Sequence, residues 1–132
     1  MTAFVDTSAI LALADKDDRF HGAAADLWIQ WTVERPHVVT SNYVVLESIA
    51  LMQSRLGMES VRSFPRHLLP VLQVEWISPD IHRRAIAALL AADRRRLSLV
   101  DCTSFELMRE LGLRRVFAFD RHFSERGLTR IP

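Results

Sequence analysis

Short apolar runs alternate with helix-length segments along this chain, and this alternation restricts its fold more than any other feature. The runs that predict strands are Ala3–Val5, His37–Val39, Val71–Ile77 and Val116–Phe119, with Gly127–Ile131 as a candidate edge strand. Helical patterns lie between them, over Thr7–Asp15, Phe20–Val33, Thr40–Gly57, Met58–Leu69 (interrupted at Pro65), Ser78–Arg96 and Asp101–Leu111. Strands that alternate with helices predict a mostly parallel sheet with helices on both faces, an α/β sandwich.

The length of the chain, 132 residues, predicts a single domain, residues 1–132, that buries a core without a disulfide or a structural zinc ion. Cys102 is the only cysteine, which excludes an internal disulfide and a thiolate zinc site and fits a reducing cytoplasm. No apolar run approaches the roughly 20 residues of a membrane span. We therefore expect a cytoplasmic protein with no membrane partner.

Two aspartates directly follow predicted strands. Asp6 comes after Ala3–Val5, and Asp120 comes after Val116–Phe119. Ligands of open parallel sheets gather outside the carboxyl ends of the strands, so both carboxylates are expected at one rim of the sheet. Each aspartate taken alone is also typical of a helix N-cap or a turn.

Glu47 interrupts the apolar face of a predicted helix. At about 100° per residue, its neighbours on the helix surface are Tyr43, Val44, Ala50 and Leu51. An unpaired charge buried there would be strongly destabilising or would shift its pKa. Glu47 therefore needs a partner, and an arginine or a metal ion would serve equally well.

Asp101 is expected at the start of a helix, with Ser104 one turn later on the same face. An N-cap role would also explain this aspartate. Taken together, however, three aspartates at element boundaries and a glutamate in an apolar face predict one electronegative pocket, whose like charges repel unless a cation neutralises them. Oxygen ligands select Mg²⁺ or Mn²⁺, and such a site suits hydrolysis of a phosphodiester bond.

Four motifs follow one another along the chain: FVDTSAILAL, VVTSNYVVLESIALM, LSLVDCTSFELM and VFAFDRHF. In this order and near these spacings, over nearly the whole chain, they closely resemble the motifs of the PIN-domain ribonucleases, and specifically the toxins of VapBC toxin–antitoxin pairs. The resemblance implies a PIN-like three-layer sandwich and an Mg²⁺- or Mn²⁺-dependent endoribonuclease. Its catalytic and metal-binding residues would be Asp6, Glu47, Asp101 and Asp120.

The same resemblance implies supporting roles for two serines, Ser8 and Ser104, which would help to organise the site. Thr7 is a weaker candidate, since a first-turn hydroxyl is its more ordinary role. The resemblance also implies an RNA substrate, a cognate VapB-like antitoxin as protein partner, and a homodimer.

Of the 17 basic residues all but Lys16 are arginines, and DRRRLSL and LRRVF cluster several of them. These clustered arginines would guide RNA phosphates toward the pocket, because guanidinium groups neutralise phosphates without reading sequence. The candidates, unranked, are Arg94, Arg95, Arg96, Arg114 and Arg115. A solvated helix end is the more ordinary explanation for each cluster taken alone. Ordinary surface roles are expected for the scattered histidines, which are His21, His37, His67, His82 and His122.

Three other functions compete with the toxin hypothesis. A non-catalytic PIN-like scaffold would hold a protein partner without turnover, although the intact acids count against it. An RNA-processing nuclease that is not a toxin would use the same motifs, but a small chain without an appended domain favours the toxin. A phosphatase of the haloacid dehalogenase type is disfavoured, because Ser8 stands where a second carboxylate is needed after a nucleophilic Asp6.

Overall fold

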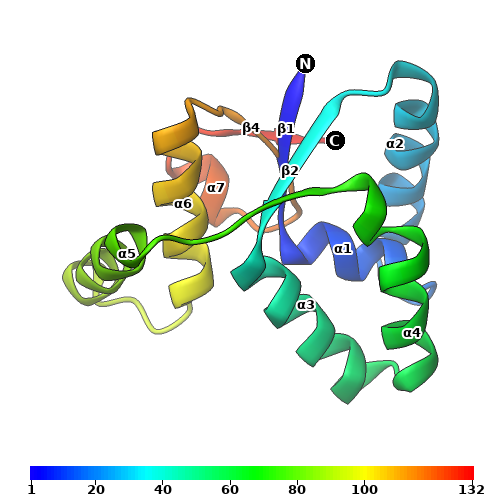
Figure 1. The fold of residues 1–132 in the computed structure, drawn as a ribbon, viewed down its shortest axis with the longest axis horizontal. Helices are drawn as coiled ribbons and strands as arrows, with labels where there is room; N and C mark the ends of the chain where they lie inside the picture. Colours follow the sequence, from blue (N-terminus) through cyan, green and yellow to red (C-terminus); the bar gives the residue numbers. More distant parts are fainter.

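The computed structural model describes residues 1–132, and a five-stranded sheet forms its central layer (Figure 1). The strands are β1 (Thr2–Val5), β2 (His37–Ser41), β3 (Gln73–Glu75), β4 (Arg115–Phe117) and β5 (Thr129–Ile131). They lie in the order β3-β2-β1-β4-β5, and every neighbouring pair is parallel. The predicted α/β fold with a parallel sheet is therefore confirmed.

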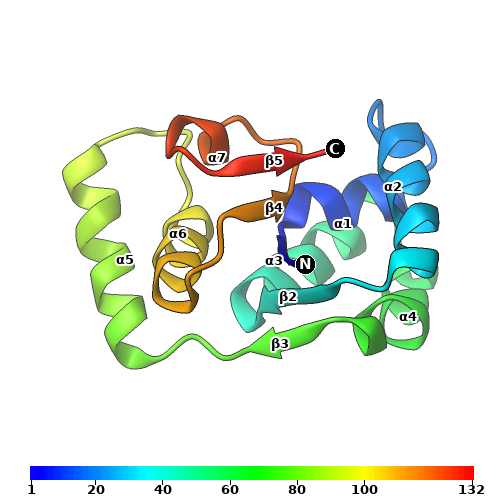
Figure 2. The same ribbon diagram turned by 90° about the horizontal axis from the view of Figure 1, so that it is seen from above.

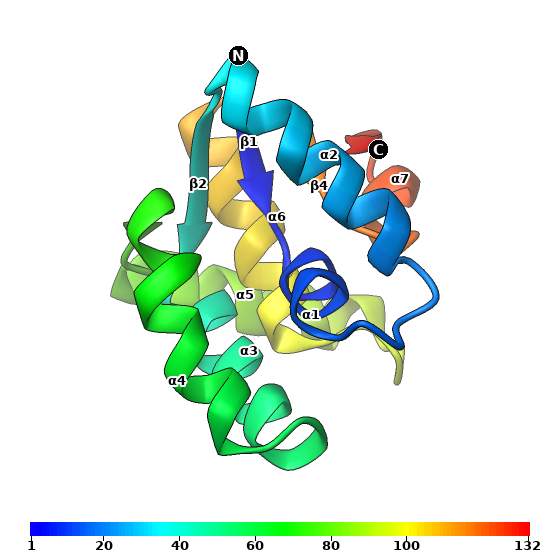
Figure 3. The ribbon, with the colours of Figure 1, turned by 90° about the vertical axis from the view of Figure 1, so that its right-hand side faces the viewer.

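Helices form the layers on both sides of this sheet. They are α1 (Thr7–Ala14), α2 (His21–Glu34), α3 (Asn42–Arg55), α4 (Met58–His67), α5 (Pro79–Ala92), α6 (Leu99–Leu111) and α7 (His122–Glu125), with a 3-10 turn, η1, at Leu69–Val71. The helices α5 and α6 pack together on one side of the sheet, whereas α2 and α4 lie on the other (Figure 1 and Figure 2). The helices α1 and α3 contact each other beyond the carboxyl ends of β1 and β2 (Figure 3). No helix combines the length and apolar character needed to cross a membrane.

Buried side chains of the two central strands hold the layers together. Phe4, Val5, Val116 and Phe117 are almost fully buried. Phe117 meets Trp31 of α2 edge to face, with ring centroids 5.3 Å apart, an arrangement that aromatic rings favour. This packing fixes the carboxyl ends of β1 and β4, and therefore the position of the residues that follow them.

Two predicted boundaries are wrong in the connection between β2 and β3. Helix α4 continues through Pro65, which lies on an exposed side near the end of the helix, so its missing N–H removes only one helical hydrogen bond. The strand predicted over Val71–Ile77 is limited to β3. Val71, the first residue of the predicted strand, belongs to the η1 turn. Ile77, its last residue, lies outside β3, and its backbone N–H donates to the Asn42 side chain at 2.7 Å.

The connection between β3 and β4 also departs from the predicted boundaries. Helix α5 ends at Ala92, where Asp93 adopts a left-handed backbone with φ 50°, so the segment Arg94–Arg96 lies beyond the helix. Helix α6 begins at Leu99 rather than at Asp101, because Ser98 supplies the cap. The sequence did not predict α7, since four residues carry no readable periodicity.

Candidate active site

Four carboxylates lie at the carboxyl edge of the sheet, each on a different segment. Asp6 follows β1, Glu47 lies in the second turn of α3, Asp101 lies in the first turn of α6, and Asp120 follows β4. Burial raises the pKa of both Asp6 and Glu47, and the charges of Asp101 and Asp120 raise them further. Because charges act strongly on one another only over short distances, the fold brings all four into one carboxylate cluster.

Asp6 is almost fully buried, with 3% of its surface exposed. Burial raises its pKa from 3.8 to about 7; hydrogen bonds from Ser8 oppose this shift, and the charges of Asp101 and Asp120 add to it. The Asp6 Oδ2 atom accepts hydrogen bonds from the backbone N–H of Ser8 at 3.1 Å and from its hydroxyl at 2.6 Å. Asp6 therefore caps helix α1 and belongs to the cluster, so both explanations of this residue hold.

Ser8 connects two segments that are far apart in the sequence. Besides donating to Asp6, its hydroxyl oxygen accepts a hydrogen bond from the backbone N–H of Phe119 at 3.0 Å. Phe119 lies beyond the end of β4 and directly precedes Asp120. Ser8 therefore holds the segment that carries Asp120 against the end of β1.

Replacing Ser8 with alanine is expected to lower the free energy of unfolding by about 1–3 kcal/mol, because a partly buried N–H and a buried carboxylate each lose a partner. Urea unfolding followed by circular dichroism measures this loss. Ser54→Ala is the matched control, since the exposed Ser54 hydroxyl only donates to the Leu51 carbonyl of its own helix at 3.3 Å. The control should change stability by less than about 0.5 kcal/mol. Equal effects of the two substitutions would contradict the bridging role.

Glu47 is half-buried on α3 and has no ion-pair partner. Burial is the main cause of its raised pKa, with a contribution from the charges of Asp101 and Asp120. The Thr7 hydroxyl and the more distant charge of Arg55 lower its pKa, but no arginine lies within ion-pair distance. Of the two partners that the sequence left open, an arginine is therefore excluded.

Asp101 is held by a capping box at the start of α6. The Ser98 backbone N–H donates to Asp101 Oδ2 at 3.2 Å, and the Asp101 backbone N–H donates to the Ser98 hydroxyl at 2.9 Å. Burial raises the pKa of Asp101 and the charge of Asp120 adds to the shift, while Ser98 and His122 oppose it. Asp101 is therefore the third residue of the helix and not its N-cap, which corrects the alternative drawn from the sequence.

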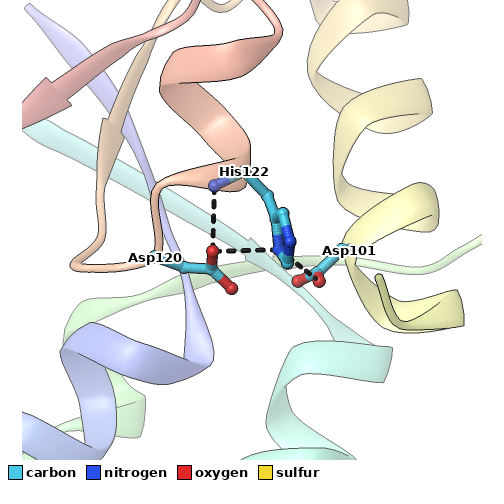
Figure 4. Close-up of side chains that lie close together, drawn as sticks. All are labelled: Asp101, Asp120 and His122. Atoms are coloured by element: carbon cyan, nitrogen blue, oxygen red, sulfur yellow. Dashed lines mark hydrogen bonds and ion pairs between the residues drawn. The ribbon is translucent and has the colours of Figure 1, made fainter. Parts of the chain in front are cut away.

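His122 lies between Asp101 and Asp120 (Figure 4). Its Nδ1 atom is 2.9 Å from Asp120 Oδ1 and 3.5 Å from Asp101 Oδ2, and its side chain is only 11% exposed. Its backbone N–H also donates to Asp120 Oδ1 at 2.9 Å, and this tight turn directs the ring back toward the carboxylate. The expectation of an ordinary surface role is therefore wrong for His122. The spacing of aspartate and histidine in DRH was the signal that could have indicated it.

The donor groups of this edge fit a hard divalent cation. Carboxylate oxygens with mutually repelling charges dominate the cluster, and Asp101, Asp120 and His122 can each place one ligand atom within 4.8 Å of the others. The hydroxyl oxygen of Ser104, one helical turn after Asp101, is buried without a hydrogen-bond partner. Buried polar atoms normally have hydrogen-bond partners, so a hydrated ion at this edge would supply the partner that is absent. The acidic cluster is therefore a candidate metal site.

Comparisons with known proteins agree with this geometry. The model of the PIN domain family matches residues 3–127. The 23S rRNA-specific endonuclease VapC20 of Mycobacterium tuberculosis is 37% identical over 129 residues, which cover 97% of this chain and 96% of the relative. The crystal structure of Mycobacterium tuberculosis VapC20, described as a sarcin-ricin loop cleaving toxin, has a TM-score of 0.85 at 35% identity and covers 98% of this chain and 97% of that chain. FitAcB from Neisseria gonorrhoeae shares the fold at 13% identity, with a TM-score of 0.70 and coverage of 100% and 97%.

Proposed function

Because this chain belongs to the PIN domain family, we propose that its carboxylate cluster is the active site of a metal-dependent endoribonuclease that cleaves 23S ribosomal RNA. Identity of 37% over nearly the full length makes the chain a VapC-type toxin endonuclease. The observation that carries the proposal is the meeting of four carboxylates from four segments at one edge of the sheet. Such a concentration of negative charge is costly unless a cation is bound.

The residues at this edge suit Mg²⁺ or Mn²⁺, which Asp6, Asp101 and Asp120 would hold through carboxylate oxygens or intervening water. When bound, the ion supplies positive charge to the scissile phosphate and lowers the pKa of the attacking water. Glu47 would bind the ion or orient that water. Ser8 keeps the Asp6 carboxylate in one orientation through two hydrogen bonds, so little rearrangement is needed when RNA binds.

The proposed substrate is the sarcin–ricin loop of 23S rRNA, because a toxin that cleaves this loop shares the fold with a TM-score of 0.85 and 35% identity. An RNA stem–loop carrying this sequence should be cut at one position in Mg²⁺ or Mn²⁺ and should stay intact in EDTA. The same stem with a scrambled loop is the matched control and should not be cut. Gel analysis of end-labelled RNA gives both rates.

The control arms separate the ways in which this proposal could fail. Cleavage that persists in EDTA would contradict a metal-dependent site. Equal cleavage of the scrambled loop would contradict the proposed target while leaving a ribonuclease. A protein that cuts neither RNA in Mg²⁺ or Mn²⁺ would contradict the assignment of this loop as substrate.

We also propose that the chain forms a homodimer and binds a cognate antitoxin protein. An apolar groove of about 720 Å³ between α1, α2, α3 and α4 offers a surface for a protein segment. Its apolar lining consists of Leu13, Ala14, Trp28, Met52, Leu56, Phe64 and Leu68. Light scattering of the purified chain tests the dimer. Purification together with the product of a short neighbouring reading frame tests the antitoxin.

A further inference from the structure

Two arginine-rich segments meet beside the carboxylate cluster. One is the loop from Asp93 to Ser98 between α5 and α6, and the other begins at Arg121 and includes α7 (Figure 2). The Arg94 guanidinium joins them through an ion pair with Glu125 of α7, with Nη1 and Oε2 2.9 Å apart. The contact between these segments places a positively charged surface next to the acidic edge.

Both segments are tied directly to residues of the cluster. The loop ends at Ser98, which exchanges two hydrogen bonds with Asp101. Arg121 stands between Asp120 and His122, whose side chains are in contact. The position of the arginines relative to the carboxylates is therefore set by the same contacts that build the site.

Arg95 and Arg96 are exposed and form no ion pair or hydrogen bond, and Arg121 has only a long contact of 3.9 Å to Glu125. The left-handed residue Asp93 ends α5, so Arg95 and Arg96 lie beyond that helix. The sequence offered a solvated helix end as the ordinary explanation of this cluster, and exposed arginines directly after the end of α5 are compatible with it. Because Arg95 and Arg96 have no ion-pair partner, their charges are available to a ligand.

We propose that Arg95, Arg96 and Arg121, the arginine rim, bind RNA phosphates and seat the substrate against the carboxylate cluster. Arg94 is a positioning residue that holds the loop to α7 through Glu125. Guanidinium groups pair with phosphates through two parallel hydrogen bonds, and cations beside an acidic site offset its repulsion of RNA. The assignment rests on the proposed ribonuclease function.

The other arginine cluster lies at the opposite end of the sheet. Arg115 begins β4, whereas Asp120 follows the carboxyl end of that strand. Arg114 is occupied in part by a hydrogen bond to the Gly127 carbonyl at 3.4 Å. The structure therefore divides the five arginines that the sequence left unranked into three beside the carboxylate cluster and two at the far end of the sheet. Arg115 is exposed and unpaired, which makes it a matched control for the rim arginines.

The test measures binding of the sarcin–ricin stem–loop by the Asp101→Asn protein, so that cleavage does not interfere, at several KCl concentrations in Mg²⁺. Each phosphate contact contributes about 0.7–0.9 to the slope of log K against log salt. Adding Arg95→Ala and Arg96→Ala together should lower the slope by about 1.5, and adding Arg121→Ala should lower it by about 0.8. Adding Arg115→Ala should leave the slope unchanged.

An unchanged slope in both rim variants would overturn the arginine rim, as would an equal reduction by Arg115→Ala. If the rim variants keep their RNA slope but lose affinity for polyglutamate, the surface serves an acidic protein partner instead, which also overturns the proposal. A parent protein that binds no RNA under any condition would refute the rim, and the cleavage assay of the wild-type protein decides the ribonuclease function. The other outcomes overturn the arginine rim and leave that function intact.

Discussion

The Asp101→Asn protein is expected to cleave the sarcin–ricin stem–loop about 100- to 1,000-fold more slowly than the wild-type protein. A metal site stabilises developing charge by several kcal/mol, and each 1.36 kcal/mol corresponds to about tenfold in rate. The charge of Asp101 raises the pKa of Asp6 and of Glu47, and Asp101 Oδ2 lies 3.5 Å from His122 Nδ1, the atom that also contacts Asp120. Loss of this one charge should therefore weaken metal binding by the whole site.

The fold should survive this substitution, since asparagine keeps a side-chain oxygen that accepts the hydrogen bond from the Ser98 N–H. Circular dichroism and thermal unfolding check this point beside the single-turnover cleavage rate. Asp26→Asn is the matched control, because Asp26 is an exposed aspartate of α2 without any ion pair. A folded Asp101→Asn protein that cleaves within threefold of the control would refute the catalytic role of the cluster.

Without metal, the protein is expected to become less stable as the pH rises from about 4 to about 7. Asp6 has a pKa of about 7 in the folded protein, against 3.8 as its ordinary value. Between these values the folded state holds a proton that the unfolded state has released, so the free energy of unfolding falls as the pH rises. For Asp6 alone, three pH units correspond to about 4 kcal/mol, or about 14 °C in melting temperature.

Thermal unfolding in EDTA at pH 5 and pH 8 measures this dependence. The Asp6→Asn protein should melt at a higher temperature than the wild type at pH 8 and should show a much flatter pH dependence, because its side chain carries no charge. Asp26→Asn should follow the wild type. Mg²⁺ should restore stability at pH 8, where the carboxylates are ionised and bind it best. A melting temperature that rises from pH 5 to pH 8 in EDTA would contradict the burial of this carboxylate.

The four acidic residues could be found from the sequence because each of them violates or ends a local pattern. Asp6 and Asp120 end apolar strands, and parallel strands place their carboxyl ends at one edge regardless of loop detail. Glu47 stands among apolar neighbours on a helix, which is visible from its period alone. Asp101 was found for a partly wrong reason, because the helix begins two residues earlier than predicted and Ser98 is its cap.

The features of the site that the sequence did not predict depend on contacts between segments that are distant in the sequence. His122 looked like any scattered histidine until the turn at Asp120 and the packing of α7 directed its ring between two aspartates. The bridge from Ser8 to Phe119 joins residues 111 positions apart, which no local pattern reveals. The sequence named Arg95 and Arg96 among five unranked candidates but missed Arg121, because α7, whose Glu125 pairs with Arg94 and joins the two segments, is too short to predict.

The strand order also determines how much of the chain must be synthesised before the carboxylate cluster is complete. β4 pairs with β1 beside the centre of the sheet, although it is made after α6. A nascent chain that already contains Asp6, Glu47 and Asp101 has an unpaired edge at β1 and lacks the segment that Ser8 holds in place. A fragment that ends before β4 therefore lacks both Asp120 and one central strand of the sheet. The carboxylate cluster is complete only after Asp120 has been added and β4 has paired with β1.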